Sequence, residues 1–388
     1  MSNGIRWVGL DVHASQTACA VFDSDTGELI TRRVMGRPHE AMGLLEQLAQ
    51  PVRAVYEAGP TGYGLARRGR AAGIDVAVCA PGMIARAGSE RIKTDKRDAI
   101  KLARLHAAGQ LVLVYVPTLE QEQLRDLARC REDARQDLMR AKHRVGKFLL
   151  RREIYYPGRG RAWTREHRAW LASLRFADAA SEATFADYLH AHDTLTARRD
   201  QLDRAIDERA RDCCWAPLIA RLRCLHGIDT LGAFGLCAEV CDFQRFPRAT
   251  SLSAYLGLVP CENTSGDKRR LRSITKAGST LARRLLVEAS YHYRRPPRIG
   301  GGLLRRQDGA DAWVVDLSWR AQRRLHGRWQ RLRSSVTSTT GSPPSPLPAS
   351  SRTSAGSWRS PTDRAHTTQH SSAVRAPRPM AVAQVVRD

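Results

Sequence analysis

The sequence predicts three folded parts: an α/β domain at the N-terminus, a long helical arm, and a mainly α-helical C-terminal domain. Short strand-like runs separated by turn residues predict the first part, and a heptad pattern of apolar residues predicts the arm. At 388 residues the chain is long enough for two or three domains with cores. We assign residues 1–115, 116–212 and 213–333 to these parts, and residues 334–388 to a disordered tail.

The N-terminal domain begins with three strand candidates in succession, at 5–12, 17–22 and 28–34. Elements that alternate between helix and strand follow: a helix at 39–49, a strand at 52–57, a helix at 63–72, a strand at 74–80 and a helix at 94–108. This succession fits an RNase H-like layout, in which helices pack on a mixed sheet. In that layout the first and fourth strands are neighbours.

Four carboxylates occupy selected positions in this layout. Asp11 ends the first strand and Glu57 ends the fourth, so the two would project side by side. Asp95 and Asp98 stand three residues apart at the start of a helix, where they share one face. Four carboxylates placed in this way can hold two hard divalent cations, an arrangement that many enzymes use to cut phosphodiesters. Taken singly, each could be an ordinary cap or turn residue, and for His13 a surface or packing role is favoured.

The composition indicates a polyanionic partner. The chain carries 63 Lys and Arg against 39 Asp and Glu, a formal net charge of +24, which makes nucleic acid the default partner. A membrane surface is the alternative, but no apolar run approaches the roughly 18 residues that a spanning helix needs. No secretory signal is expected, because Asp11 and His13 interrupt the early apolar stretch.

The nine cysteines show no CxxC pair of zinc-site spacing, so a reducing, cytoplasmic compartment is expected. Cys237 and Cys241, with His226 upstream, could suggest a metal site. Free cysteines commonly fill helix cores, however, and we favour that interpretation.

The arm is predicted to be an antiparallel coiled coil of two long helices around a middle segment, 153–194. Residues three and four apart form a heptad seam in the first helix: Leu124, Leu127, Arg131, Ala134, Leu138, Ala141, Val145 and Phe148. Arg131 is its one residue out of the apolar pattern. A weaker seam in the second helix contains Leu195, Arg199, Leu202 and Ile206. Basic residues gather at the end of the first helix. They could form a solvated face, or the arm could pack on a second subunit and offer Arg144 and Lys147 to nucleic acid.

The C-terminal domain has two candidate phosphate contacts. The segment 225–230 before a helix at 231–239 looks like a helix-hairpin-helix turn, in which Gly227 would present backbone N–H groups to a phosphate. Ser265 lies in a Gly-containing loop with the setting of a phosphate-facing hydroxyl. Its basic neighbours are Lys268, Arg269, Arg270, Arg272 and Lys276. From composition alone, an ordinary polar turn is the favoured interpretation of this loop.

Six motifs in order make the chain resemble the IS110 family of insertion-sequence transposases, which have an N-terminal DEDD domain. They are Gly9-Leu10-Asp11-Val12-His13, Glu57-Ala58-Gly59-Pro60-Thr61-Gly62, Lys93-Thr94-Asp95-Lys96-Arg97-Asp98-Ala99, Ala254-Tyr255-Leu256-Gly257-Leu258-Val259-Pro260, Ser265-Gly266 and Ile274-Thr275-Lys276-Ala277-Gly278. The resemblance covers about residues 5–330. It implies a RuvC-like domain whose tetrad, Asp11, Glu57, Asp95 and Asp98, binds Mg²⁺ (or Mn²⁺).

The resemblance also implies a C-terminal transposase domain in which Ser265 is the nucleophile and forms a phosphoserine link to DNA. Family members act on the element ends and a target site, and a structured RNA made from the element guides them. They assemble through the arm as homo-oligomers, either dimers or tetramers. The resemblance favours an active site in which the tetrad of one chain meets the serine of another. A cytoplasmic, nucleoid-associated bacterial protein is expected.

The chain departs from the family pattern at two places. Thr264 stands where members commonly have the first serine of Ser-Ser-Gly, and we keep Ser265 because it precedes Gly266. From residue 334 the sequence turns to Ser, Thr, Pro and Arg, where the family continues with an apolar helix. We hypothesise a frameshift there, which translating the other two reading frames would test. Two alternatives stay open: a RuvC-like metal-dependent structure-specific nuclease that uses water, and an inactive nucleic-acid-binding remnant of a transposase.

Overall fold

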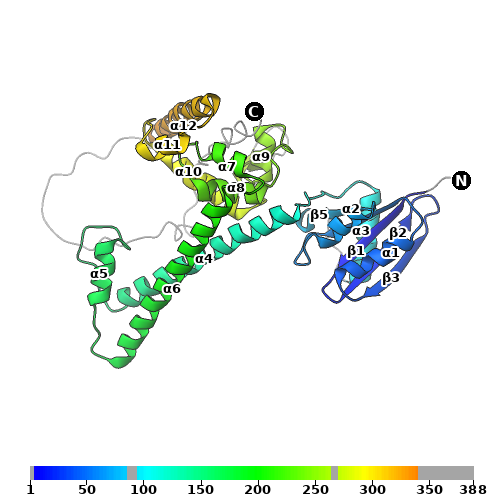
Figure 1. Cartoon of the computed structure of the whole chain (residues 1–388), viewed down its shortest axis with the longest axis horizontal. Helices are drawn as coiled ribbons and strands as arrows, with labels where there is room; N and C mark the ends of the chain where they lie inside the picture. Colours follow the sequence, from blue (N-terminus) through cyan, green and yellow to red (C-terminus); the bar gives the residue numbers. More distant parts are fainter. Residues whose placement is uncertain (1–3, 85–93, 264–269, 340–388) are drawn as a thin grey trace. The chain divides into compact units, whose positions relative to one another are not determined.

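The computed structural model describes residues 4–84, 94–263 and 270–339, with side chains as far as residue 334. Three predicted site residues, Ser265, Lys268 and Arg269, lie outside the described residues. The chain divides into two compact units, Met1–Leu119 and Glu120–Asp388 (Figure 1). Each unit has a hydrophobic core of its own.

The first unit is built on a five-stranded mixed sheet with the strand order β3-β2-β1-β4-β5. The strands are β1 (Arg6–Val12), β2 (Gln16–Asp23), β3 (Leu29–Met35), β4 (Val52–Glu57) and β5 (Asp75–Cys79). β1, β2 and β3 pair antiparallel, whereas β4 pairs parallel with both β1 and β5. Leu10 of β1 stands opposite Tyr56 of β4, so the next residue of each strand is a predicted carboxylate.

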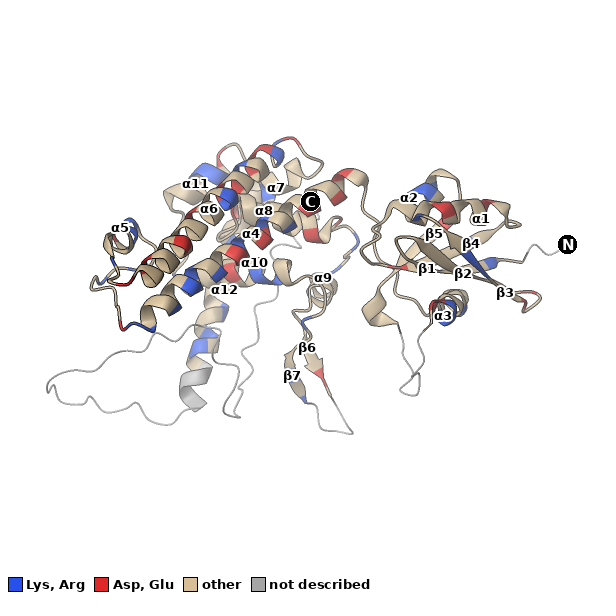
Figure 2. Cartoon of the chain, turned by 90° about the horizontal axis from the view of Figure 1, so that it is seen from below, with Lys and Arg blue, Asp and Glu red and all other residues tan. Residues whose placement is uncertain are grey.

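Helices cover both faces of this sheet (Figure 2). The helices α1 (Ala41–Gln47) and α2 (Gly64–Ala71) pack on one face, where Leu10 and Tyr56 are buried among their apolar side chains. The helix α3 (Asp95–Ala107) packs on the other face against Ala18 and Ala20, whose small side chains allow a close approach. Two single 3-10 turns, η1 (Pro38–Glu40) and η2 (Pro81–Met83), complete the described elements of this unit.

Two long helices dominate the first half of the second unit. They are α4 (Leu119–Leu150) and α6 (Ala179–Arg209), joined through α5 (Arg165–Ser173). They lie beside each other, with Arg131 Nε of α4 2.6 Å from Asp203 Oδ1 of α6 (Figure 1).

The predicted middle segment, 153–194, is wrong at its second boundary, because α6 begins at Ala179. Asp178 caps the helix by accepting a hydrogen bond from Ser181 N at 2.7 Å. Phe185 then packs in a cluster with Phe148. This first part of α6 therefore buries its apolar face in an aromatic cluster at the end of the arm, a contact that leaves no heptad pattern.

The rest of the second unit is mainly helical. Its elements are α7 (Ala216–Leu222), α8 (Thr230–Val240), α9 (Ala249–Tyr255), a small β6 (Pro260–Glu262) and β7 (Leu271–Ile274) hairpin, α10 (Thr280–Tyr291), η3 (His292–Arg294), α11 (Gly301–Gln307) and α12 (Ala312–Thr339). α8 is the central helix, since every residue from Ala233 to Val240 is buried. α12 continues beyond residue 334, where we placed the start of the tail.

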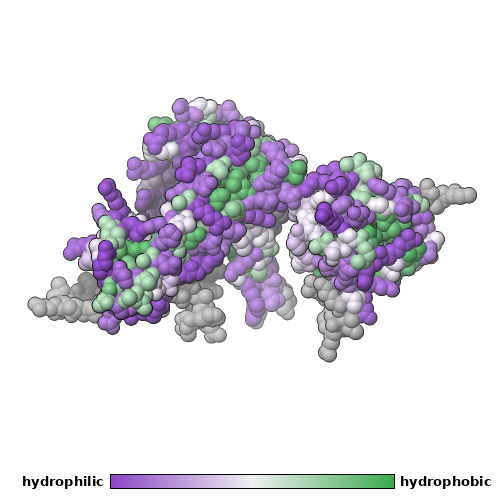
Figure 3. All heavy atoms as spheres, turned by 60° about the horizontal axis from the view of Figure 1, so that its bottom comes forward, coloured by the Kyte–Doolittle hydropathy of each residue, from purple (hydrophilic) through white to green (hydrophobic). Residues whose placement is uncertain are grey.

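On the face seen in Figure 3, hydrophilic residues cover much of each unit, and smaller hydrophobic areas lie among these residues. Within the described ranges, no helix combines the length and the apolar character needed to cross a membrane. The prediction of an N-terminal mixed α/β domain followed by a mainly helical part is confirmed.

Candidate functional site

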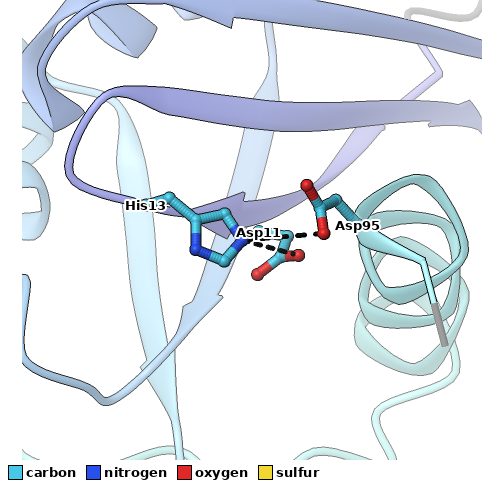
Figure 4. A group of neighbouring side chains, drawn as sticks. All are labelled: Asp11, His13 and Asp95. Atoms are coloured by element: carbon cyan, nitrogen blue, oxygen red, sulfur yellow. Dashed lines mark hydrogen bonds and ion pairs between the residues drawn. The ribbon is translucent and has the colours of Figure 1, made fainter.

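Asp11, His13 and Asp95 bring their side chains together at the end of β1 (Figure 4). One ligand atom from each lies within 4.8 Å of the other two. His13 Nε2 is 3.3 Å from Asp11 Oδ2 and 3.8 Å from Asp95 Oδ1. Gln16 Nε2 donates a hydrogen bond to Asp95 Oδ2 at 3.2 Å. Two carboxylates from distant parts of the sequence thus share a small polar site.

Local sequence explains how Asp95 is held. Thr94 caps α3, and its side chain accepts a hydrogen bond from Arg97 N at 3.3 Å. Asp95 and Asp98 both lie in the first turn, where negative charge interacts favourably with the exposed N–H groups of the helix. Gly9 then allows α3 to lie against β1, because a Cβ at this position would stand only 2.0 Å from Ala99 O. The cap and this close contact fix the acidic end of α3 near Asp11.

Glu57 lies on the same side of the sheet as α3. Val55, two residues earlier in β4, packs against Leu102 of α3, and side chains two apart along a strand share a face. The Glu57 side chain is exposed. Neither Glu57 nor Asp98 belongs to the group of ligand atoms within 4.8 Å of one another in the described part of the chain. The negative charge of Asp98 nevertheless contributes to the raised pKa of the Asp11 carboxyl.

The pKa of the Asp11 carboxyl is raised above its ordinary value. Partial burial is the largest cause, and the negative charges of Asp95 and Asp98 add to it, while the charge and hydrogen bond of His13 oppose the shift. A bound cation would relieve this crowding of negative charge. Carboxylate oxygens are the ligands that Mg²⁺ and Mn²⁺ prefer, so the donor set fits a hard divalent cation.

His13, for which a surface or packing role was favoured, contacts both carboxylates, and Gln16, which was not among the predicted site residues, contacts Asp95. His13 stands two residues after Asp11, and that spacing at a strand end was the available signal that both point the same way. Gln16 gave no signal of its own. It reaches Asp95 because the short turn between β1 and β2 returns the chain to the same edge of the site, with Val12 paired to Thr17.

The residues predicted to bind nucleic acid are spread over the second unit. Arg144, Lys147, Arg270 and Lys276 are exposed. Gly227 has a φ of +86° in the turn before α8, and an added Cβ would lie 2.7 Å from Ala289 O, so packing against α10 already requires a glycine. With Ser265, Lys268 and Arg269 outside the described residues, these assignments stay predictions.

Cys237 and Cys241 are buried. Their burial agrees with the interpretation that they fill the core around α8. In the described part of the chain, neither belongs to the group of possible metal ligands that Asp11, His13 and Asp95 form.

Comparisons with known proteins agree with the resemblance. Residues 8–153 match the family model of IS110-type DEDD transposases, whose description is "Transposase". The family described as Transposase IS116/IS110/IS902 matches residues 219–298.

Individual relatives extend this match over most of the chain. A Sinorhizobium fredii protein named as a transposase, y4qE, is 36% identical over 84% of this chain and 81% of its own length. The transposase for insertion sequence element IS1533 of Leptospira borgpetersenii is 31% identical over 84% of this chain and 96% of its own. Both halves of the chain match models of this family, and both relatives match it over most of their own length. The chain therefore belongs to the IS110 family of transposases.

Proposed function

We propose that this transposase cuts and rejoins DNA strands with a divalent metal site formed by Asp11, Glu57, Asp95 and Asp98 and with Ser265 as the nucleophile. The observation that carries the metal site is the convergence of Asp11, His13 and Asp95 within 4.8 Å. The strand order β3-β2-β1-β4-β5, with its parallel β1–β4 pair, supports an RNase H-like (RuvC-like) interpretation of the first unit.

In this mechanism the four carboxylates would hold Mg²⁺ or Mn²⁺, which would polarise the scissile phosphate and stabilise the attacking and leaving oxygens. His13 and Gln16 orient the Asp11 and Asp95 carboxylates through their contacts. The Ser265 hydroxyl gives up its proton as its oxygen bonds to phosphorus. The P–O bond to the displaced strand breaks, and the leaving oxygen takes a proton to become a hydroxyl. Attack by the hydroxyl of another strand on the phosphoserine then rejoins the DNA and releases Ser265.

The partners proposed are the element ends, a target DNA and a structured RNA encoded by the element, which acts as a guide. The protein would work as a homo-oligomer at the bacterial nucleoid. The net charge of +24 supports binding to nucleic acid. The exposed Arg144 and Lys147 on α4 support contacts through the arm.

The test is recombination between donor and target plasmids with the element RNA supplied, using wild type, Asp11→Asn and Ser265→Ala. The proposal expects both variants to abolish recombination, and wild type to form a protein–DNA adduct at Ser265. If Ser265→Ala recombines while Asp11→Asn does not, the serine proposal is wrong and a nuclease that uses water is favoured. If wild type is inactive, a chain with the last helix restored from another reading frame tests the inactive-remnant alternative.

A further inference from the structure

A basic cavity of about 560 Å³ lies in the second unit, among segments that the carboxylate chemistry does not use. Its walls are the turn 226–229 before α8, residues 291–298 at the end of α10 and after it, and residues 300–306 at and within α11. Gly227 belongs to the first wall and packs against the second, so the turn and the end of α10 form one surface. Figure 2 shows Lys and Arg on α10 and α11 in blue.

Arginines give this cavity its charge. Arg295, Arg298 and Arg306 line it, against one carboxylate, Asp229. Asp229 is engaged as the cap of α8, where its Oδ1 accepts a hydrogen bond from Gly232 N at 2.7 Å. Arg306 is also engaged, since its Nε donates to Arg223 O at 2.8 Å.

Arg295 and Arg298 differ from the other charged residues of the cavity. Both are exposed, and neither side chain has an ion-pair partner in the part of the chain that the structure describes. Two guanidinium groups that line the cavity are therefore available to an anion. A guanidinium group can bind a phosphate with two parallel hydrogen bonds, whereas a lysine ammonium acts as a point charge.

An aromatic ring and an open backbone lie beside these arginines. Tyr291 also lines the cavity, and 57% of this residue is exposed. Gly300 and Gly302 stand at the beginning of α11, and no described atom lies within 4 Å of a Cβ added to either. Packing thus does not require glycine there, whereas a glycine backbone does permit the close approach of a ligand.

We propose that this cavity binds a single-stranded stretch of nucleic acid, with its phosphates on Arg295 and Arg298 and one base stacked on Tyr291. An aromatic face and a basic groove together are the means by which proteins hold unpaired strands, because a base within a duplex has no free face to offer. DNA and RNA share this chemistry. The inference goes beyond the proposed function in naming a binding site, and it depends on neither the metal nor Ser265.

The test measures fluorescence anisotropy of the full chain with labelled single-stranded DNA, single-stranded RNA of the same sequence, and duplex DNA. EDTA is present, so that no cleavage occurs and a failure of the catalytic proposal leaves the result interpretable. The variants are Arg295→Ala with Arg298→Ala, and separately Tyr291→Leu. The control is Arg204→Ala with Arg323→Ala, which removes the same charge from exposed positions of the second unit outside the cavity.

The double arginine variant is expected to weaken single-strand binding about tenfold or more. It should also lower the slope of log affinity against log salt by about 1.4, because two phosphate contacts are lost from a single strand. Tyr291→Leu should weaken binding about tenfold with the salt slope unchanged, because stacking involves no counterion release. The control pair should leave single-strand affinity close to wild type.

A loss seen with DNA alone, with RNA alone or with both supports the site and identifies the strand. Wild-type affinity and slope in the double variant, or an equal loss on duplex DNA, would overturn the proposal. Circular dichroism of each variant separates lost binding from lost folding. If a variant misfolds, crosslinking of 5-iodouracil oligonucleotides to wild type provides the second test: a crosslink at Tyr291 supports the site, and crosslinks only elsewhere oppose it.

Discussion

His13 Nε2 lies 3.3 Å from Asp11 Oδ2, at the point where β1 ends and the first hairpin begins. The same nitrogen is 3.8 Å from Asp95 Oδ1, so a single imidazole contacts the carboxylate from the strand and the carboxylate from α3. A residue in this position can fix the orientation of both carboxylates. Mutation of a residue that orients metal ligands typically lowers metal affinity or activity by about 10-fold to 100-fold.

His13→Gln is therefore expected to lower metal-dependent DNA cleavage by about 10-fold to 100-fold at limiting Mg²⁺. Higher Mg²⁺ should restore part of the rate, because the carboxylates themselves remain. The measurement is the cleavage rate over a range of Mg²⁺ concentrations. His39→Gln is the control, since His39 is exposed in the same unit and contacts Glu40 instead. An unchanged Mg²⁺ dependence in His13→Gln would show that the imidazole does not orient the ligands.

Gly9→Ala should separate α3 from β1. The new Cβ would lie 2.0 Å from Ala99 O and 2.5 Å from Ala103 N, which are backbone atoms that cannot rotate away. We expect a loss of about 3 kcal/mol or more in local stability, together with loss of activity, because α3 carries Asp95. Hydrogen exchange of peptides from β1 and α3 measures this.

Gly43→Ala is the matched control for this prediction. Gly43 is exposed in α1, and no described atom lies within 4 Å of an added Cβ. Alanine there should stabilise the helix by about 0.5–1 kcal/mol, because it restricts the unfolded chain more than glycine does. Equal exchange rates in the β1 and α3 peptides of the two variants would contradict the role assigned to Gly9.

Asp203→Asn should destabilise the pair of long helices. Arg131 interrupts the apolar seam of α4 and is explained by its ion pair with Asp203, in which both side chains are less than a quarter exposed. Removing one partner is expected to cost about 1–2 kcal/mol. The double change Arg131→Leu with Asp203→Leu should return stability to the wild-type level or above, because it completes the seam. Urea denaturation followed by circular dichroism measures both. A double variant no more stable than Asp203→Asn would show that the ion pair has another role.

Most elements of the first unit could be predicted because short apolar runs bounded by turn residues mark strands that are covered on both faces. The predicted strand 52–57 coincides with β4, and 5–12 differs from β1 by one residue. The beginning of α6 at Ala179 could not be predicted from heptads, because Phe185 packs in an aromatic cluster and not in a helix seam. Local patterns thus predict elements whose burial is regular, and they fail where burial depends on one particular cluster.

The candidate site was predictable in part, for a related reason. The position of Asp11 and Glu57 at strand ends follows from the pattern, but the distance between Asp11 and Asp95 depends on how closely α3 lies against Gly9. The contact of Gln16 with Asp95 depends on the geometry of one hairpin. Such contacts form only when the tertiary structure is complete, so the sequence alone predicts the types of residue at the site better than the whole set.

Glu239 predicts how the stability of the second unit depends on pH. Burial acts to raise the pKa of this carboxyl, but the hydrogen bonds and charge of Arg129 outweigh it, and the pKa lies below its ordinary value of 4.5. Because the folded-state pKa is lower than the unfolded one, the stabilisation is complete above the unfolded value. It is lost as the pH falls through the folded-state value.

Glu239→Gln should therefore cost about 1–2 kcal/mol at neutral pH, a figure reduced because Arg129 is half exposed. The difference from wild type should shrink as the pH falls below 4.5. Urea midpoints at neutral and acid pH measure this, with Glu208→Gln, an exposed position on α6, as the control. A difference that stays constant with pH would mean that the Glu239 charge does not contribute to stability.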